Sequence, residues 1–343
     1  MCCGPAWCEP SVMNFAAYPP SALGEKLMGD HAWAIYATGE IDADAGQRLD
    51  ALIAEKHIPN LSHLYLHSPG GNLLGGIAMG RVIRAHQFQT DVGQFGAGKL
   101  YTTVPRPGYC YSACAVAFLG GEYRFLLNGS VYGVHRFFWK EHTPSDADLA
   151  QVLSAAVVDY MQSMGVSTEL FSLASQAGPD QVVTPTADKL LALGVINNGR
   201  KPVAWSIESV PGAIYLKGQQ ETSFGINKFL LVCPAQGQMQ FWAIFDAGQN
   251  TDEVLKWSTH WLFVDGQQIQ IQDHLAMEEV KNGWINLTYT VDDRLLSMVV
   301  AARNYIGIGL SPAPGAAIFE GFDRMPFDGA VAKLSGFLQV CRH

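Results

Sequence analysis

The sequence has little charge, and it has no apolar run long enough to cross a lipid bilayer. A membrane-spanning helix needs roughly 18 or more consecutive apolar residues, and no stretch of the chain reaches that length. Only 15% of the 343 residues are charged, and the net charge of −9 is accompanied by no basic run that would bind phosphate groups. We therefore expect neither a membrane span nor a nucleic-acid partner.

Signals for export and for a bound metal are also missing. The first residues, Met1 to Pro5, have neither the basic region nor the apolar region of a signal peptide as the sequence stands. A wrongly assigned start codon or an already removed leader would explain this N-terminus equally well, so the compartment is left open. Cys2, Cys3 and Cys8 have no histidine close by, and we expect no metal site and no cofactor.

The composition is that of a packed globular protein, because 48% of the residues are hydrophobic and the length allows two domains. We expect an irregular segment over residues 1–28, an α/β domain over 29–199 and a smaller, mostly β domain over 200–343. The last of these would have strands at 207–217, 227–234, 239–245, 260–264 and 284–291, and a helix within 327–340. A small sandwich, or an antiparallel sheet with a helix, fits that pattern.

In the first domain, strand and helix patterns alternate. Residues 33–38 and 63–67 predict strands, and apolar residues at helical spacing predict helices over 44–56 and 74–85. A further strand around Thr102 to Val104 is expected to lead to Ser112. Strand, glycine turn and helix thus occur twice, which is typical of right-handed β–α units. A long helix from Ser145 carries an apolar stripe between Leu149 and Met164 that is either core or a subunit contact.

Ser112 lies between a turn-prone segment and a run of small and apolar residues that predicts a buried helix. A serine at the first turn of such a helix has an exposed oxygen, and the amides of the helix N-terminus favour developing negative charge. Nucleophilic serines occupy an elbow of this kind on another fold. The alternative is that Ser112 only caps the helix.

Two further segments have the residue types that such chemistry needs. The turn Ser68-Pro69-Gly70-Gly71 lets the backbone approach a ligand, so that the amide of Gly71 could face a carbonyl oxygen, although ordinary loops also contain glycine pairs. The strand over 131–135 ends in His135, and the span from Ser112 allows one helix and one return strand. His135 would then be a base beside the nucleophile, or else a core or surface histidine.

Together these segments resemble the proteolytic subunit of the Clp protease, and more closely its exported bacterial relatives. Residues 108–121 match the nucleophile segment of that family without a gap, and 68–71 are similar to its oxyanion turn. Residues 124–135 resemble the segment bearing its catalytic histidine. Asp180, four residues before Thr184, resembles its third triad member. The resemblance covers residues 39–197 and leaves out the last 140 or so.

The resemblance implies an α/β fold of the ClpP/crotonase type, built from repeated β-β-α units, and a serine peptidase acting on a peptide or protein. Ser112 would be the nucleophile, His135 the base and Asp180 the group that orients the imidazole, with Asp188 or Glu169 as other acids for that third role. The implied oxyanion hole consists of the amides of Gly70, Gly71 and Ala113.

The resemblance further implies a homo-oligomer and, through the exported relatives, a periplasmic location. An unfoldase partner is not expected, because the N-terminal segment does not resemble the family's docking loops. Two other functions are left open. One is a crotonase-like acyl-CoA enzyme, which shares the fold but does not need a serine–histidine pair. The other is a catalytically idle scaffold whose β-rich domain binds a partner.

The remaining cysteines form two pairs. Cys110 and Cys114 flank Ser112, and they are either bridged across the elbow or two buried thiols. For Cys233 and Cys341 we expect a disulfide, since it would tie down a C-terminal element that otherwise frays, although two buried thiols are the alternative. Such a bridge requires an oxidising compartment.

Overall fold

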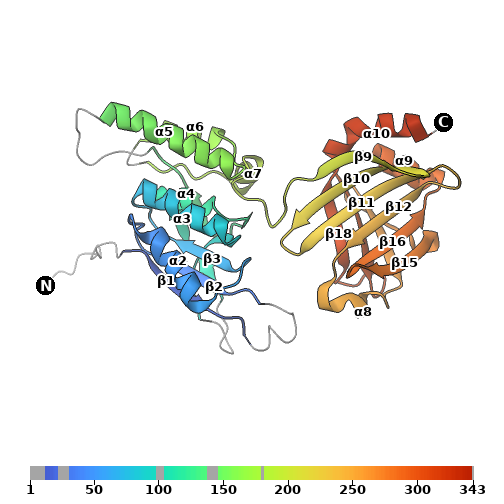
Figure 1. Cartoon of the computed structure of the whole chain (residues 1–343), viewed down its shortest axis with the longest axis horizontal. Helices are drawn as coiled ribbons and strands as arrows, with labels where there is room; N and C mark the ends of the chain where they lie inside the picture. Colours follow the sequence, from blue (N-terminus) through green and yellow to red (C-terminus); the bar gives the residue numbers. More distant parts are fainter. Residues whose placement is uncertain (1–11, 22–30, 98–103, 137–145, 179–180, 342–343) are drawn as a thin grey trace. The chain divides into compact units, whose positions relative to one another are not determined.

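The computed structural model describes residues 12–21, 31–97, 104–136, 146–178 and 181–341 (Figure 1). The chain divides into two compact units, Met1–Gly199 and Arg200–His343. Helices and mixed sheets make the chain an α/β protein. Among the described residues, no helix combines the length and apolar character needed to cross a membrane.

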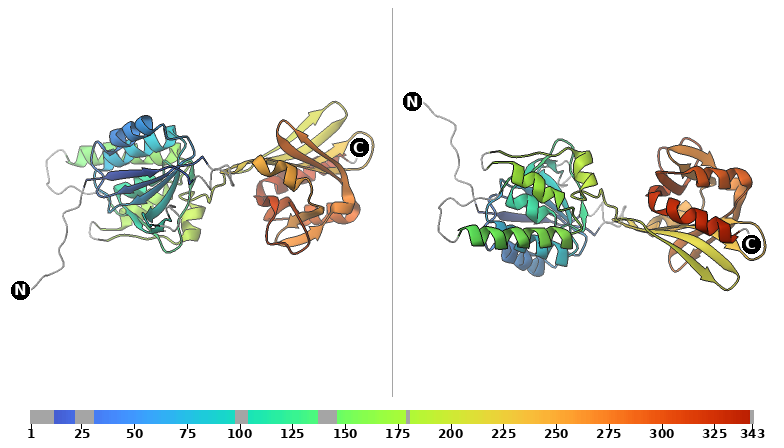
Figure 2. Two further views of the ribbon diagram at one scale, coloured as in Figure 1. Left: turned by 90° about the horizontal axis from the view of Figure 1, so that it is seen from below. Right: turned by 90° about the horizontal axis from the view of Figure 1, so that it is seen from above.

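The first unit is built on a six-stranded sheet with a parallel centre. Its central parallel strands are β2 (Ala34–Thr38), β3 (His63–His67) and β4 (Gln89–Gln94). The helix α2 (Ala45–Lys56) joins the first two strands and α3 (Leu73–Ala85) joins the next two. Figure 2 shows these helices next to each other along one face of the sheet. Because the strands are parallel, the loops that follow β2 and β3 meet at one edge of the sheet.

The edges of this sheet include a strand where the sequence predicted irregular structure. β1 (Asn14–Tyr18) pairs antiparallel with β2, so the expectation of an irregular segment over residues 1–28 is wrong for this part of it. Met13 is buried and Phe15 and Ala17 pack against the core, so alternate residues of this short segment face inward. At the other side, β5 (Arg106–Pro107) and β7 (Tyr123–Arg124) both pair with β4.

A separate two-stranded sheet carries the Ser112 segment. Its parallel strands are β6 (Tyr109–Tyr111) and β8 (Val131–Gly133). The helix α4 (Ala113–Phe118) begins directly after Ser112. The strand directly before Ser112 is therefore β6 and not the expected one around Thr102 to Val104. Val104 belongs to no strand, and Thr102 lies outside the described residues.

The helix α3 packs closely on α4 through glycines. A Cβ at Gly76 would lie 2.5 Å from the carbonyl oxygen of Ala113 in α4. A Cβ at Gly80 would lie 3.2 Å from the carbonyl oxygen of Ala117 in α4, and it would also collide with the hydroxyl of Tyr160, which belongs to a later helix. Both positions therefore need glycine if the helices are to approach this closely.

The last part of the first unit consists of α5 (Asp146–Ser163), α6 (Glu169–Gln176) and α7 (Ala187–Ala192). In the apolar stripe of α5, Tyr160 and Met161 are buried in the core, whereas Val152 is 65% exposed. The C-terminal half of the stripe is thus core, and the exposed Val152 leaves a subunit contact as a prediction for the other half.

The second unit contains two antiparallel sheets. In spatial order, the six-stranded sheet consists of β15 (Leu275–Lys281), β16 (Trp284–Thr290), β12 (Gln240–Phe245), β11 (Gly225–Pro234), β10 (Ala213–Thr222) and β9 (Ala204–Val210). The four-stranded sheet consists of β14 (Gln267–Gln270), β13 (Thr259–Val264), β17 (Tyr305–Ser311) and β18 (Glu320–Pro326). The α-helices of the unit are α8 (Thr251–Val254), α9 (Asp293–Ala301) and α10 (Asp328–Cys341).

Both sheets contribute to one core, which includes Phe241 and Leu287 from the first sheet and Leu262 and Ile308 from the second. A disulfide joins Cys233 of β11 to Cys341 at the end of α10. The single strand predicted over 207–217 is instead a hairpin, because Pro211-Gly212 makes a turn between β9 and β10 in which Gly212 has a φ of +89°.

Asp91 of β4 is a half-buried carboxyl group whose pKa is raised to about 6. Burial is the dominant cause, because it disfavours the charged form. Hydrogen bonds from the amides of Val92 and Leu127, both 2.7 Å long, act in the opposite direction. The carboxyl group therefore titrates at a higher pH in the folded protein than in the unfolded chain.

This difference predicts a pH-dependent stability. The protonated Asp91 stabilises the fold below its unfolded pKa of 3.8, and that contribution is lost as the pH rises through about 6. Asp91→Asn keeps the oxygen acceptor but cannot ionise. We expect the free energy of unfolding of the wild type to fall relative to that of Asp91→Asn, by up to about 3 kcal/mol between pH 4 and 7. Urea unfolding across this range measures both proteins, and a difference between them that is independent of pH contradicts the assignment.

Candidate active site

Ser112 occupies a strained turn between β6 and α4. Its φ of +57° and ψ of −122° lie in a region that residues with a side chain rarely adopt, at a cost of about 1–3 kcal/mol. The amide of Ser112 donates to the carbonyl of Gly133 (3.1 Å), and its own carbonyl accepts from the amide of Val116 (3.2 Å). The serine is therefore held from the strand side and from the helix side.

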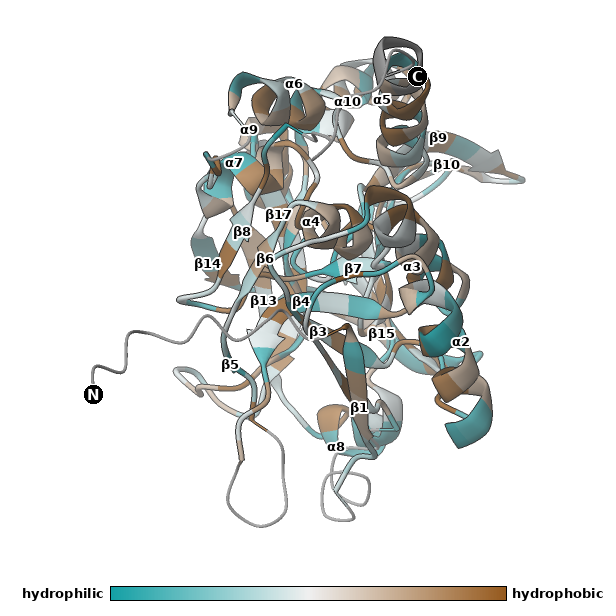
Figure 3. Cartoon of the chain, turned by 90° about the vertical axis from the view of Figure 1, so that its left-hand side faces the viewer, coloured by the Kyte–Doolittle hydropathy of each residue, from teal (hydrophilic) through white to brown (hydrophobic). Residues whose placement is uncertain are grey.

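The helix that follows Ser112 is short and completely buried. All six of its residues are buried, and Figure 3 shows α4 in the colours of hydrophobic residues. A helix end placed in the core needs partners for its carbonyl groups. Side-chain hydroxyls supply some of them, through the bonds Tyr132 Oη to Ala115 O (3.1 Å), Tyr160 Oη to Val116 O (3.1 Å) and Thr90 Oγ1 to Phe118 O (2.9 Å).

Two arginines bind the backbone where α4 ends. Arg124 is only 4% exposed and donates to the carbonyls of Leu119, Gly121, Gly194 and Val195. Burial lowers its pKa to about 10, so it remains a cation at neutral pH. Arg84 donates to the carbonyls of Leu119, Gly120 and Gly121 and pairs with the carboxylate of Glu122 at 2.9 Å. Cations at this position also suit the negative end of the helix dipole.

The glycine turn lies directly against the serine. The amide of Ser68 donates to the carbonyl of Tyr109 (2.9 Å), and the amide of Tyr111 donates to the carbonyl of Ser68 (3.1 Å), so the turn is joined to β6. A Cβ at Gly70 would lie 2.6 Å from the Cβ of Ser112 and 3.2 Å from the nitrogen of Ala113. Because that space is already filled, only glycine allows this contact.

The three expected oxyanion donors differ in their hydrogen bonds. The amide of Gly70 donates to Ser68 Oγ at 3.1 Å and is therefore engaged. Gly71 is exposed with a φ of +132°, and Ala113 is the first residue of α4, whose amide has no acceptor within the helix. For neither of these amides does the described part of the chain supply an acceptor. Of the three expected donors, the amides of Gly71 and Ala113 are thus the two without a partner among the described residues.

His135 follows the strand next to that of the serine. In the parallel pair, Tyr111 lies opposite Gly133, so Ser112 and His135 leave neighbouring strands at the same end. The Nδ1 atom of His135 is 2.8 Å from the carbonyl oxygen of Arg136, and a carbonyl can only accept, so Nδ1 is the protonated nitrogen in this bond. In the neutral imidazole, Nε2 is then the basic nitrogen.

The third member of the predicted triad, Asp180, lies outside the described residues. The segment just after it is held near the histidine, because Val183 and Val134 exchange backbone hydrogen bonds of 2.8 and 2.9 Å. Of the other acids considered, Glu169 forms an ion pair with Lys189 at 2.6 Å. Asp188 lies in the first turn of α7. The role of Asp180 therefore stays a prediction.

Sequence reasoning missed a histidine that contacts β6 beside the glycine turn. His67 ends β3, directly before the glycine turn, and its Nδ1 accepts from the amide of Tyr109 at 3.3 Å. Its ring packs on Tyr109 with a centroid separation of 4.2 Å, and burial lowers its pKa. A neutral His67 therefore helps to join the turn to β6. Its position beside the Ser68 to Gly71 turn was the available signal, but a strand-end histidine has no distinctive sequence pattern.

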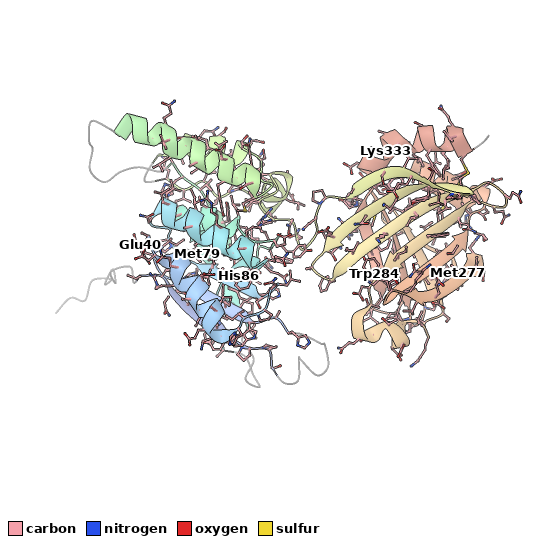
Figure 4. The ribbon with its side chains drawn as sticks, viewed as in Figure 1. Glu40, Met79, His86, Met277, Trp284 and Lys333 are labelled. Carbon is pink, nitrogen blue, oxygen red and sulfur yellow. A yellow bond between two sulfur atoms is a disulfide. The ribbon has the colours of Figure 1, made fainter. Side chains whose placement is uncertain are left out.

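A cleft of about 400 Å³ lies beside the glycine turn. It is lined by Val12, Glu40, Ile41, Asp42, Ala43, Gly71 and Asn72, and Glu40 is labelled in Figure 4. Asp42 is neutralised by Arg48, which lowers the pKa of the carboxyl group to about 2. No group of three or more metal-binding side chains occurs among the residues that the structure describes. The Ser112 hydroxyl group, the His135 imidazole and the amides of Gly71 and Ala113 are group types that acyl transfer can use, and of these residues only Gly71 lines the cleft.

The buried Arg124 predicts a large stability effect. We expect Arg124→Lys to lower the free energy of unfolding by about 2–4 kcal/mol, because a lysine cannot reach all four carbonyls and each buried group left unpaired costs about 1–3 kcal/mol. Arg81→Lys on the exposed part of α3 is the matched control, with no change beyond about 0.5 kcal/mol expected. Urea unfolding measures both, and equal stabilities of the two variants contradict the assignment.

Comparisons with known proteins give a distant structural likeness and no match at the level of sequence. No family model matches the sequence, and no curated protein matches it. Among solved structures, ClpP1 from Listeria monocytogenes is similar to 46% of this chain and 85% of its own length, with 16% sequence identity and a TM-score of 0.35. At these values the likeness concerns the fold alone.

Proposed function

We propose that the first unit is a serine hydrolase, and more narrowly a peptidase, with Ser112 as its nucleophile. The observation that carries this proposal is the strained Ser112 at the start of a buried helix, packed against Gly70 and one strand away from His135. An ordinary helix cap has no need of a positive φ or of a histidine at the neighbouring strand end. The proposed fold is of the ClpP/crotonase type, with a hydrolase domain over 29–199 and a β-rich domain over 200–343.

In the proposed reaction, Ser112 Oγ attacks the substrate carbonyl carbon while Nε2 of His135 takes the hydroxyl proton. The carbonyl oxygen becomes negative and accepts hydrogen bonds from the amides of Gly71 and Ala113, each donor being worth about 3–4 kcal/mol in a site of this kind. His135 then gives its proton to the leaving group, and water hydrolyses the acyl-serine by the same steps. Asp180 is the proposed orienting acid for Nδ1, which in this structure donates to the carbonyl of Arg136.

The substrate and assembly are proposed more broadly. A peptide or protein substrate, a homo-oligomer formed through the exposed part of α5 around Val152, and an exported or periplasmic location agree with the resemblance of the sequence segments. The disulfide between Cys233 and Cys341 supports the location, because such bonds persist in oxidising compartments.

A binding role for the second unit has its own support. A cavity of about 410 Å³ in this unit is lined by aromatic side chains that include Trp261, Phe263, Tyr305 and Phe319, next to polar groups such as Asp265. Aromatic walls with a few polar groups are typical of ligand sites. We therefore keep a partner-binding scaffold as the second candidate function, and a crotonase-like acyl-CoA enzyme as the third.

Labelling with a fluorophosphonate separates these functions. A hydrolase is expected to be labelled at Ser112, and Ser112→Ala should lose both labelling and hydrolysis of activated esters while its Tm changes by only a few degrees. The control is Ser172→Ala on the exposed face of α6, which should behave as the wild type does. Full residual turnover in purified Ser112→Ala would exclude the mechanism, and a folded wild type without labelling would favour the scaffold or the acyl-CoA enzyme.

The base is tested by His135→Ala, which should lower kcat about 10⁴-fold because loss of a triad member commonly has this effect. His86→Ala is the control, since His86 at the end of α3 pairs with Asp50 away from the catalytic turn. Steady-state ester hydrolysis by the two variants gives the comparison. If His135→Ala and His86→Ala lower kcat equally, His135 is not the base.

The orienting role of Asp180 is tested by Asp180→Asn. This variant should also reduce kcat severely, because the imidazole of His135 would lose the acid that holds it. A mild effect of Asp180→Asn with a severe effect of Asp188→Asn or Glu169→Gln would move the role to one of those acids.

A further inference from the structure

A disulfide encloses the proposed nucleophile. Cys110 in β6 is bonded to Cys114, the second residue of α4, and both cysteines are fully buried. The sequence left this pair open between a bridge and two buried thiols, and the structure has the bridge. The bond closes a ring around Tyr111, Ser112 and Ala113, so it holds both the proposed nucleophile and one proposed oxyanion donor.

The enclosed segment is the part of the site with the strongest reason to relax. Ser112 has a positive φ, and a serine lowers its backbone strain by leaving such a conformation. The backbone hydrogen bonds of Ser112 to Gly133 and Val116 oppose this relaxation, but single hydrogen bonds contribute little net stability. The cross-link fixes the end of β6 and the start of α4 on either side of Ser112, and it therefore favours the strained conformation.

We propose that Cys110 and Cys114 are positioning residues whose disulfide holds Ser112 and Ala113 in the reactive arrangement, so that the nucleophile becomes competent only once the bond has formed. This inference rests on the proposed function. It assigns to the pair a role beyond general stability, because the cross-link acts on the turn that carries the reacting oxygen.

Formation of the bond needs an electron acceptor, and we take this to be a disulfide of a protein or of a small thiol compound. The two cysteine thiols lose two protons and two electrons and form one S–S bond, while the acceptor disulfide is reduced to two thiols. Because both cysteines are fully buried in the folded unit, the exchange takes place before the elbow closes. The redox conditions during folding therefore determine whether the folded unit is active.

The chain provides a matched control for this proposal. The second disulfide, Cys233–Cys341, lies in the other compact unit and is half-buried. Its removal tests the effect of losing a native disulfide without touching the Ser112 turn. The reduced wild type is a further control, since it keeps every sulfur atom of the core and lacks only the bonds.

The experiment compares four samples of the full chain: wild type refolded with a disulfide redox buffer, wild type refolded with a dithiol, Cys110→Ala/Cys114→Ala and Cys233→Ala/Cys341→Ala. Non-reducing peptide mapping establishes which bonds each sample contains. The measurements are the rate of Ser112 labelling by a fluorophosphonate, and kcat and KM for an activated ester.

We expect the dithiol-refolded wild type and Cys110→Ala/Cys114→Ala to lose labelling rate and kcat about a hundredfold, since a displacement of about 1 Å at a reacting group has that effect. Their KM should change less than about threefold. Oxidised Cys233→Ala/Cys341→Ala should label like the oxidised wild type even if its Tm falls. Equal labelling rates in all four samples would overturn the proposal, and so would equal losses in the two double variants.

Hydrogen exchange gives a readout that does not depend on activity. The amides of residues 108–119 should exchange faster in Cys110→Ala/Cys114→Ala, while β3 and α3 keep their protection. Unchanged exchange over 108–119 would contradict the proposal even if activity falls. If oxidised wild type is not labelled at Ser112, the proposed function fails, and the exchange measurement still decides whether the bond orders the turn.

Discussion

The candidate site depends on the burial of one short helix with its carbonyl groups satisfied. A helix of six residues has few hydrogen bonds of its own and is not stable in isolation. In the core, away from solvent, the carbonyls of α4 and of the turn after it accept hydrogen bonds from side chains. These donors are the guanidinium groups of Arg84 and Arg124 and the hydroxyl groups of Tyr132, Tyr160 and Thr90. The position of Ser112 at the other end of this helix is therefore a property of the whole first unit.

The two ends of α4 have complementary electrostatics. Two guanidinium groups bind the carbonyls where the helix ends, and the amide of Ala113, which has no acceptor among the described residues, lies where it begins. The arginines compensate the negative end of the helix, and in the proposed reaction the positive end would face the developing oxyanion. Arg124 is nearly inaccessible and binds only backbone carbonyls among its hydrogen-bond partners in the described residues, so any effect it has on Ser112 is transmitted through the backbone.

Sequence reasoning succeeded where a signal is local. The bounds of β3 and α2 followed from clear periodicity, and local patterns also placed Ser112 before a buried helix and His135 after a strand. It failed where the cause is distant in the chain. Gln89 and Thr90 make β4 look polar, yet both are buried, with partners at Leu61 and Phe118 that no local pattern reveals. The roles of Arg124 and of the β1 segment were missed for the same reason.

The close approach of α3 to α4 has a consequence for how related chains diverge. A reactive serine or histidine can be exchanged in a descendant that loses its chemistry, since neither side chain holds the helices together. Gly76 and Gly80 have no such freedom, because any larger residue meets the backbone of Ala113 or the ring of Tyr160. This glycine spacing, followed by a short apolar helix, should therefore persist in distant relatives even where the proposed catalytic residues have been replaced.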